Sequence, residues 1–172
     1  MTDQSLTYQE LADGLYETTL EAGRKIMEIF AREINVNYKE DKSPVTEADE
    51  AAEKIILKTL AALTPAIPVI AEEQTNAGNT PDVEDKFWLV DPLDGTKEFI
   101  KKGTDFTVNI ALIENGLPTF GIVYAPALGR MFVAKDPQTA VQMDVTDEKV
   151  IGQETPLMVR DVPPTGIVAV AV

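Results

Sequence analysis

Two stretches of the chain repeat apolar residues at the three- and four-residue spacing of a helix with one buried face. In residues 7–32 the apolar positions are Leu11, Leu15, Ala22, Ile26 and Ile29. In residues 47–63 they are Ala52, Ile55, Ile56, Leu60 and Leu63. Thr46 and Asp49 fit a capping box at the start of the second stretch. The pattern therefore predicts two long helices that pack by one face.

The second half of the chain instead alternates apolar and polar residues, which is typical of strands with one buried face. The clearest runs are residues 106–113, 119–124 and 130–134, with a short apolar run at 67–71 and weaker runs around 36–39, 140–143 and 155–160. Asn115-Gly116 favours a tight hairpin turn, because both residues tolerate positive φ. These patterns predict an α+β fold in which the two long helices lie against an antiparallel sheet.

Residues 87–101 contain the most informative motif. We expect a buried strand over 87–90 that breaks at Asp91-Pro92, because proline lacks an N–H group and biases the residue before it to an extended conformation. A helix over 96–101 should follow, with Asp94 placed to cap it. Two carboxylates three residues apart would then lie on a strand-to-helix turn beside Gly95. Such a turn combines ligands for a hard cation with the N–H groups that bind phosphate at a helix start.

Composition limits the chemistry of this turn. The chain has 172 residues, of which 44% are hydrophobic and 26% charged, in the range of an ordinary folded domain. It has no Cys and no His, so thiolate nucleophiles, disulfides, zinc fingers and histidine bases are excluded. A metal site must therefore use oxygen ligands, which suit Mg²⁺, Mn²⁺ or Ca²⁺.

The charge and the apolar runs limit the partners. The net charge of −14 argues against binding to nucleic acid or to an anionic membrane surface. No apolar run reaches transmembrane length, and the N-terminus lacks a signal-peptide pattern. We expect a cytoplasmic protein, with peripheral association with the inner membrane as the alternative.

Other acids could join Asp91 and Asp94. Asp49 fits a helix cap better than a metal ligand on pattern alone. Glu72 and Glu73 follow the short strand at 67–71, where adjacent acids are commonly only solvated, and the polar segment 74–85 predicts a loop that could serve as a lid. Lys42 and Lys97 could contact an anionic substrate, although a solvated lysine is the more usual role.

Taken together, residues 43–49, Glu72-Glu73, 88–99 and 106–113 resemble the inositol monophosphatase-like superfamily of Mg²⁺-dependent, Li⁺-sensitive phosphatases. Within it, residues 90–99 are most similar to the bacterial 3′(2′),5′-bisphosphate nucleotidases of sulfate assimilation (the CysQ type). Inositol-phosphatase relatives usually have Asn-Phe, not Lys-Glu-Phe, after Asp-Gly-Thr. The resemblance implies the N-terminal half of a layered αβαβα fold. It also implies removal of the 3′-phosphate from 3′-phosphoadenosine 5′-phosphate, giving AMP, by metal-activated water.

The same resemblance implies the roles of individual residues. Two or three Mg²⁺ ions, with Mn²⁺ as an alternative, are implied to bind Glu72, Asp91, the backbone carbonyl of Leu93, and Asp94, with Asp91 bridging two ions. The residues implied to hold or activate the water are Asp49, Glu72 and Thr96. The residues implied to meet the substrate are Glu72, Leu93, Asp94, Gly95 and Thr96, where the N–H groups of Gly95 and Thr96 hold the phosphate.

Relatives in this family normally continue for about another hundred residues. That part is implied to supply one more metal-binding Asp, in a Trp-Asp motif, and most contacts to the nucleoside. Residues 167–172 are all apolar, as in a parallel strand buried on both faces. We therefore expect an N-terminal fragment with a metal-binding α+β domain over 1–160 and the start of a truncated C-terminal α/β domain over 161–172.

Such a fragment should have little or no activity alone and should self-associate through its exposed apolar edge. Two alternatives stay open for the function. One is an inositol-phosphate or fructose-bisphosphate phosphatase. The other is a non-catalytic fragment that binds Mg²⁺.

Overall fold

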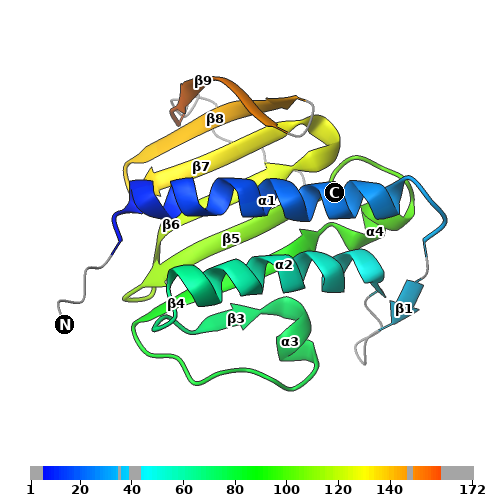
Figure 1. The fold of residues 1–172 in the computed structure, drawn as a ribbon, viewed down its shortest axis with the longest axis horizontal. Coiled ribbons are helices and arrows are strands. Elements are labelled where there is room, and N and C mark those ends of the chain that lie inside the picture. Colours follow the sequence, from blue (N-terminus) through cyan, green and yellow to red (C-terminus); the bar gives the residue numbers. More distant parts are fainter. Residues whose placement is uncertain (1–5, 35, 39–43, 147–148, 160–172) are drawn as a thin grey trace, which may run out of the picture.

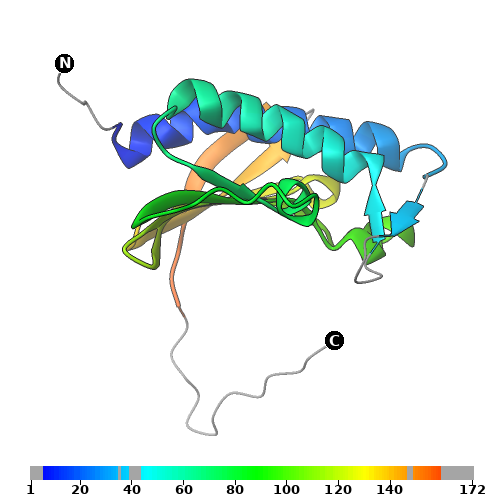
Figure 2. The ribbon, with the colours of Figure 1, turned by 90° about the horizontal axis from the view of Figure 1, so that it is seen from below.

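The computed structural model describes residues 6–34, 36–38, 44–146 and 149–159. Helices α1 and α2 lie side by side across one face of a seven-stranded sheet, and neither covers the other face (Figures 1 and 2). The predicted α+β fold, with two long helices against a sheet, is confirmed. Lys39, Lys42, residues 161–172 and the self-association expected at 167–172 lie outside the described residues.

The helices α1 (Tyr8–Phe30) and α2 (Glu47–Leu63) form where the apolar spacing predicts them. Each begins with a capping box, which in α2 pairs Thr46 with Asp49 and satisfies N–H groups that lack partners within the helix. No helix in the described part of the chain is long and apolar enough to cross a membrane. The two helices join the core through side chains that include Leu15, Ile26, Ile29, Ile56 and Leu60.

The seven strands follow one another in the sheet in chain order. They are β3 (Val69–Ala71), β4 (Lys86–Asp94), β5 (Thr107–Glu114), β6 (Leu117–Ala125), β7 (Arg130–Asp136), β8 (Thr139–Thr146) and β9 (Lys149–Leu157). All neighbours are antiparallel except β3 and β4, which are parallel. The predicted antiparallel sheet is confirmed from β4 to β9, and the parallel pairing of β3 with β4 was not predicted. Helix α3 (Glu72–Asn76) and the loop after it form the crossover that a parallel pair needs.

Shorter elements connect these layers. A two-stranded antiparallel pair, β1 (Val36–Tyr38) and β2 (Pro44–Thr46), leads into α2. Helix α4 (Thr96–Ile100) follows β4, and the 3₁₀ helix η1 (Pro126–Leu128) follows β6. The hairpin between β5 and β6 turns at Asn115 and Gly116, with φ of 53° and 77°, as predicted.

Alternation along β5 decides which side chains face the helices. Val108, Ile110 and Leu112 are buried in the core, whereas the intervening Asn109 and Ala111 are only partly buried. Successive side chains of a strand point to opposite faces, so Asn109 lies on the face that the long helices leave uncovered. This polar residue is paired with Asp91 of β4.

Trp88 links the C-terminal end of α2 to strand β4 of the sheet. Its side chain is fully buried, and its indole N–H donates to Thr64 Oγ1 at 2.9 Å. Thr64→Val keeps the shape but removes the acceptor, so we expect a loss of about 1–3 kcal/mol in the free energy of unfolding. Urea unfolding should show little loss for Thr64→Ser, which keeps the hydroxyl. Equal stability of the Val and Ser variants would contradict this role for the hydrogen bond.

Candidate functional site

The acidic turn lies at the end of β4. The strand does not break at Asp91-Pro92 as predicted but continues to Asp94, with a shift in its pairing to β5 between the two aspartates. Pro92 is accommodated because the β3 partners reach only Val90 and the β5 pairing skips this position, so neither neighbour needs its missing N–H. The prediction that Asp94 caps α4 is also wrong. The N-cap is Gly95, which is left-handed with φ of 91° and makes no side-chain cap.

Glu72 and Asp91 meet just beyond the last pair of the parallel β3–β4 ladder, Ala71 with Val90. Their side chains share a hydrogen bond, and Asp91 Oδ1 also accepts the backbone N–H of Leu93 at 3.2 Å. Burial, with the added negative charge of Glu72 and of Asp94, raises the pKa of Asp91 to about 7. Asp91 therefore keeps its proton up to near neutral pH unless a cation offsets the neighbouring negative charge.

Asp49 lies beneath the same turn. Its Oδ2 accepts the backbone N–H and the hydroxyl of Thr46 at 2.8 and 2.7 Å, so the predicted role as a helix cap is confirmed. Its Oδ1 is 3.1 Å from the hydroxyl of Thr96, which is also 3.1 Å from the carbonyl oxygen of Leu93. Burial raises the pKa of Asp49, and the hydrogen bonds from Thr46 and Thr96 oppose that rise. Because Asp49 is only 1% exposed, it reaches the turn through Thr96.

Two residues near these acids were not predicted from the sequence. Asn109 is opposite Asp91 in the β4–β5 pair, and its Nδ2 donates to Asp94 Oδ2 at 3.4 Å. The Oδ1 of Asn109 is buried without a hydrogen-bond partner in the described part of the chain. An amide side chain inside the mostly apolar run 106–113 is the signal that could have found it. Glu53 of α2 is the second, at 5% exposure.

The donor set fits a hard divalent cation. The carboxylates of Glu72, Asp91 and Asp94 and the carbonyl of Leu93 are oxygen ligands of the kind that Mg²⁺ prefers. In the described parts of the chain, no group of three acids is arranged to hold an ion. A hydrogen bond between the carboxyl groups of Asp91 and Glu72 needs a proton, which a bound cation would displace. The residues therefore fit such an ion once Asp91 is ionised.

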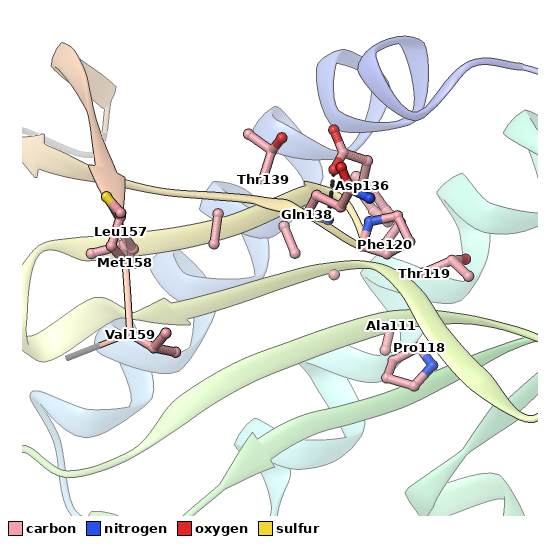
Figure 3. Close-up of a pocket in the computed structure, with 14 residues that line it drawn as sticks. Ala111, Pro118, Thr119, Phe120, Asp136, Gln138, Thr139, Leu157, Met158 and Val159 are labelled. Atoms are coloured by element: carbon pink, nitrogen blue, oxygen red, sulfur yellow. Dashed lines mark hydrogen bonds between the residues drawn. The ribbon is translucent and has the colours of Figure 1, made fainter. Parts of the chain in front are cut away.

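A hollow of about 370 Å³ adjoins the turn and is lined in part by Asp94, Gly95 and Phe106. A larger hollow, of about 550 Å³, lies elsewhere on the sheet and reaches from Ala111 on β5 to Val159 beyond β9 (Figure 3). The described lining of that larger hollow has no basic residue, and its acid, Asp136, accepts the backbone N–H of Gln138 at 2.7 Å. Of these two hollows, the smaller one is thus the one that adjoins Asp94 and Gly95 of the turn.

Sequence comparisons identify a family and curated relatives that this chain is similar to. A profile described as the inositol monophosphatase family matches residues 7–162. A curated protein of Salmonella typhimurium, named 3′(2′),5′-bisphosphate nucleotidase CysQ, is 51% identical over 117 residues, which are 67% of this chain and 48% of that protein. The protein of the same name from Escherichia coli O157:H7 is 45% identical over 128 residues, 73% of this chain and 52% of that one. The chain spans about half the length of the curated relatives it matches.

Solved structures show the same arrangement of helices and sheet. CysQ from Bacteroides thetaiotaomicron, described as a bacterial member of the inositol monophosphatase family, aligns with a TM-score of 0.68 at 29% identity and covers 92% of this chain and 61% of that one. The IMPase of Thermotoga maritima aligns with a TM-score of 0.68 at 29% identity, over 77% of this chain and 51% of that one. The two-layer fold is thus similar to part of each of these larger structures.

Proposed function

This chain belongs to the inositol monophosphatase family, and we propose that the protein containing it removes the 3′-phosphate from 3′-phosphoadenosine 5′-phosphate to give AMP, with Mg²⁺ as its cofactor. The observation that carries the proposal is the arrangement at the paired strands β3 and β4, where Glu72 follows β3, Asp91 and Asp94 lie on β4, and Thr96 is hydrogen-bonded to buried Asp49. The relatives named 3′(2′),5′-bisphosphate nucleotidase support this substrate class. The likeness to the IMPase of Thermotoga maritima makes inositol phosphates the second candidate.

The metal would be held by the carboxylates of Glu72, Asp91 and Asp94 and by the carbonyl of Leu93. Bound there, Mg²⁺ supplies positive charge that acidifies water and offsets charge developing on the phosphate. Asp91 has to release its proton first, because only the ionised carboxylate is a good ligand. Its raised pKa, about 7, keeps this proton exchange within the physiological range.

Thr96 orients the attacking water. When its hydroxyl donates to Asp49 Oδ1, 3.1 Å away, its oxygen keeps lone pairs that can accept a hydrogen bond from water. Buried Asp49 thereby sets the direction of the hydroxyl without meeting the substrate. The backbone N–H groups of Gly95 and Thr96 bind the phosphate. The water oxygen then bonds to phosphorus as the bond from phosphorus to the 3′ oxygen breaks, and a water proton ends on that leaving oxygen.

Phosphate release tests the proposal. The complete gene product is incubated with Mg²⁺ and 3′-phosphoadenosine 5′-phosphate, inositol 1-phosphate or fructose 1,6-bisphosphate, with EDTA as the metal-free control. We expect the nucleotide to be turned over at least about tenfold faster than the other two, and EDTA to stop release. Faster turnover of a sugar phosphate would favour the second candidate. No release from any substrate would contradict both, and the 172-residue chain, assayed in parallel, is expected to bind Mg²⁺ but release little phosphate.

A further inference from the structure

Glu53 connects α2 to the segment that carries Glu72. Its side chain is 5% exposed, and its two carboxylate oxygens accept the backbone N–H of Glu73 at 2.7 Å and of Gln74 at 3.1 Å. These are the second and third residues of α3, whose N–H groups a side chain at the N-cap usually satisfies. The N-cap here is Ala71, which makes no side-chain cap. Glu53 of α2 therefore caps the N-terminus of α3, because the N-cap residue Ala71 has no side chain that can accept these N–H groups.

The position of Glu72 is consequently fixed from both sides. On its N-terminal side, Ala71 is paired with Val90 of β4 in the parallel ladder. On its C-terminal side, the next two backbone N–H groups are bound to Glu53. Strand β3 is only three residues long, so its ladder alone gives a short anchor. The hydrogen bonds to Glu53 therefore add a second anchor after Glu72. We call the pairing of Ala71 and these two hydrogen bonds the clamp that holds Glu72 near Asp91.

We propose that Glu53 is a positioning residue that holds the α3 backbone so that Glu72 faces Asp91, and that it thereby sets the affinity of the site for a divalent cation. This inference rests on the proposed function, because it takes Glu72 as a metal ligand. In this role Glu53 is not itself a ligand, and its two oxygens accept the N–H groups of Glu73 and Gln74. It acts on the metal only through the backbone that carries Glu72.

The chemistry of the contact explains why a carboxylate is used. Two N–H donors need two acceptors, and a carboxylate offers both and also interacts favourably with the positive end of a helix. Glutamine at this position would keep one acceptor but turn an NH₂ group toward the other N–H. Glu53→Gln should therefore loosen the start of α3 while preserving side-chain size. Residues that support metal ligands in this way typically change metal affinity or activity by about 10–100-fold when replaced.

The test measures Mn²⁺ binding by electron paramagnetic resonance in the complete gene product, without substrate. We expect Glu53→Gln to raise the Kd for Mn²⁺ at least about tenfold. The matched control is Glu50→Gln, which removes the same charge from an exposed position of α2 and should leave the Kd within about twofold. Glu53→Asp keeps the carboxylate one methylene shorter, so it should give a smaller rise. It also serves as the second variant if Glu53→Gln does not fold.

A double-mutant cycle separates this role from general destabilisation. If Glu53 acts through Glu72, then Glu53→Gln should add less than about a twofold change in Kd when Glu72 is already Gln. If the rises in Kd of the two single variants multiply in the double variant, the inference is overturned. It is also overturned if Glu72→Gln raises the Kd while Glu53→Gln leaves it unchanged. If Glu72→Gln itself leaves the Kd unchanged, the proposed metal site fails instead. Amide exchange at Glu73 and Gln74 in the metal-free protein should be faster in Glu53→Gln, and unchanged exchange would contradict the clamp.

Discussion

Replacing Asp91 with asparagine should nearly abolish Mg²⁺-dependent phosphate release while leaving the fold intact. Groups that only support a metal ligand already cost about 10–100-fold when replaced, so loss of the proposed central ligand should exceed about a hundredfold. The fold should survive because the strand around Asp91 is held by its pairing with β5 and by the buried Val90 and Leu93, not by the carboxylate. Wild-type turnover in Asp91→Asn would contradict the assignment.

The same variant should become more stable without metal, and the sign follows from the pKa. The folded chain raises the pKa of Asp91 from 3.8 to about 7, so folding favours the protonated carboxyl. The contribution of the Asp91 carboxyl to the free energy of unfolding is therefore fully present below about pH 4, and it is lost as the pH rises through about 7. At pH 8 the ionised carboxylate faces Glu72 and Asp94 without a counter-charge. Asparagine removes that repulsion.

The size of this gain is limited by solvent. One pKa unit corresponds to about 1.4 kcal/mol, but Asp91 is partly exposed, and screening should reduce the gain to about 1–2 kcal/mol. Urea unfolding in EDTA should show wild type losing stability between pH 5 and pH 8 relative to Asp91→Asn. Asp85→Asn, at an exposed position just before β4, makes the same charge change and is the control. A parallel pH dependence of wild type and Asp91→Asn would show that the acids are not crowded.

Helices and turns that depend on neighbouring residues could be predicted from the sequence. Contacts between segments that are distant in the sequence could not. The two long helices and the Asn115-Gly116 hairpin depend on spacing, caps and turn residues within a few positions. The parallel pairing of β3 with β4 depends on where a crossover of more than a dozen residues returns. That pairing is what brings Glu72 to Asp91, so the residue pattern named both acids, and only the family resemblance implied that they lie together.

Asn109 and Glu53 illustrate the same limit at the site. Each lies in a segment whose apolar pattern was predicted correctly, but each meets its partner only across two elements of the fold. Register places Asn109 opposite Asp91, and helix packing places Glu53 beneath α3. The error at Pro92 has a related cause. A proline is compatible with a strand where the neighbouring ladders stop, and the extent of a ladder is not a local property.

Gly95→Ala should destabilise the protein and disable the site, because two independent constraints meet at this residue. Its φ of 91° lies in the region that residues with a Cβ avoid. An added Cβ would also lie 2.5 Å from the backbone carbonyl oxygen of Asp105 and 3.1 Å from Phe106 Cα, which cannot move aside as a flexible side chain can. The need for glycine here thus comes from the protein's own backbone, and not only from space for a phosphate.

Gly116→Ala separates the two constraints. Gly116 has φ of 77°, but an added Cβ there would meet nothing within 4 Å. It should therefore show only the cost of the left-handed conformation, about 1–2 kcal/mol, and leave turnover unchanged. Gly95→Ala adds the clash, so thermal unfolding should show a further loss of about 1–3 kcal/mol. Because the residue lies between Asp94 and Thr96, the shift should also lower turnover at least about tenfold. Equal losses in the two variants would mean that the Asp105 backbone yields, and that the turn carrying Asp94 and Thr96 is not rigid.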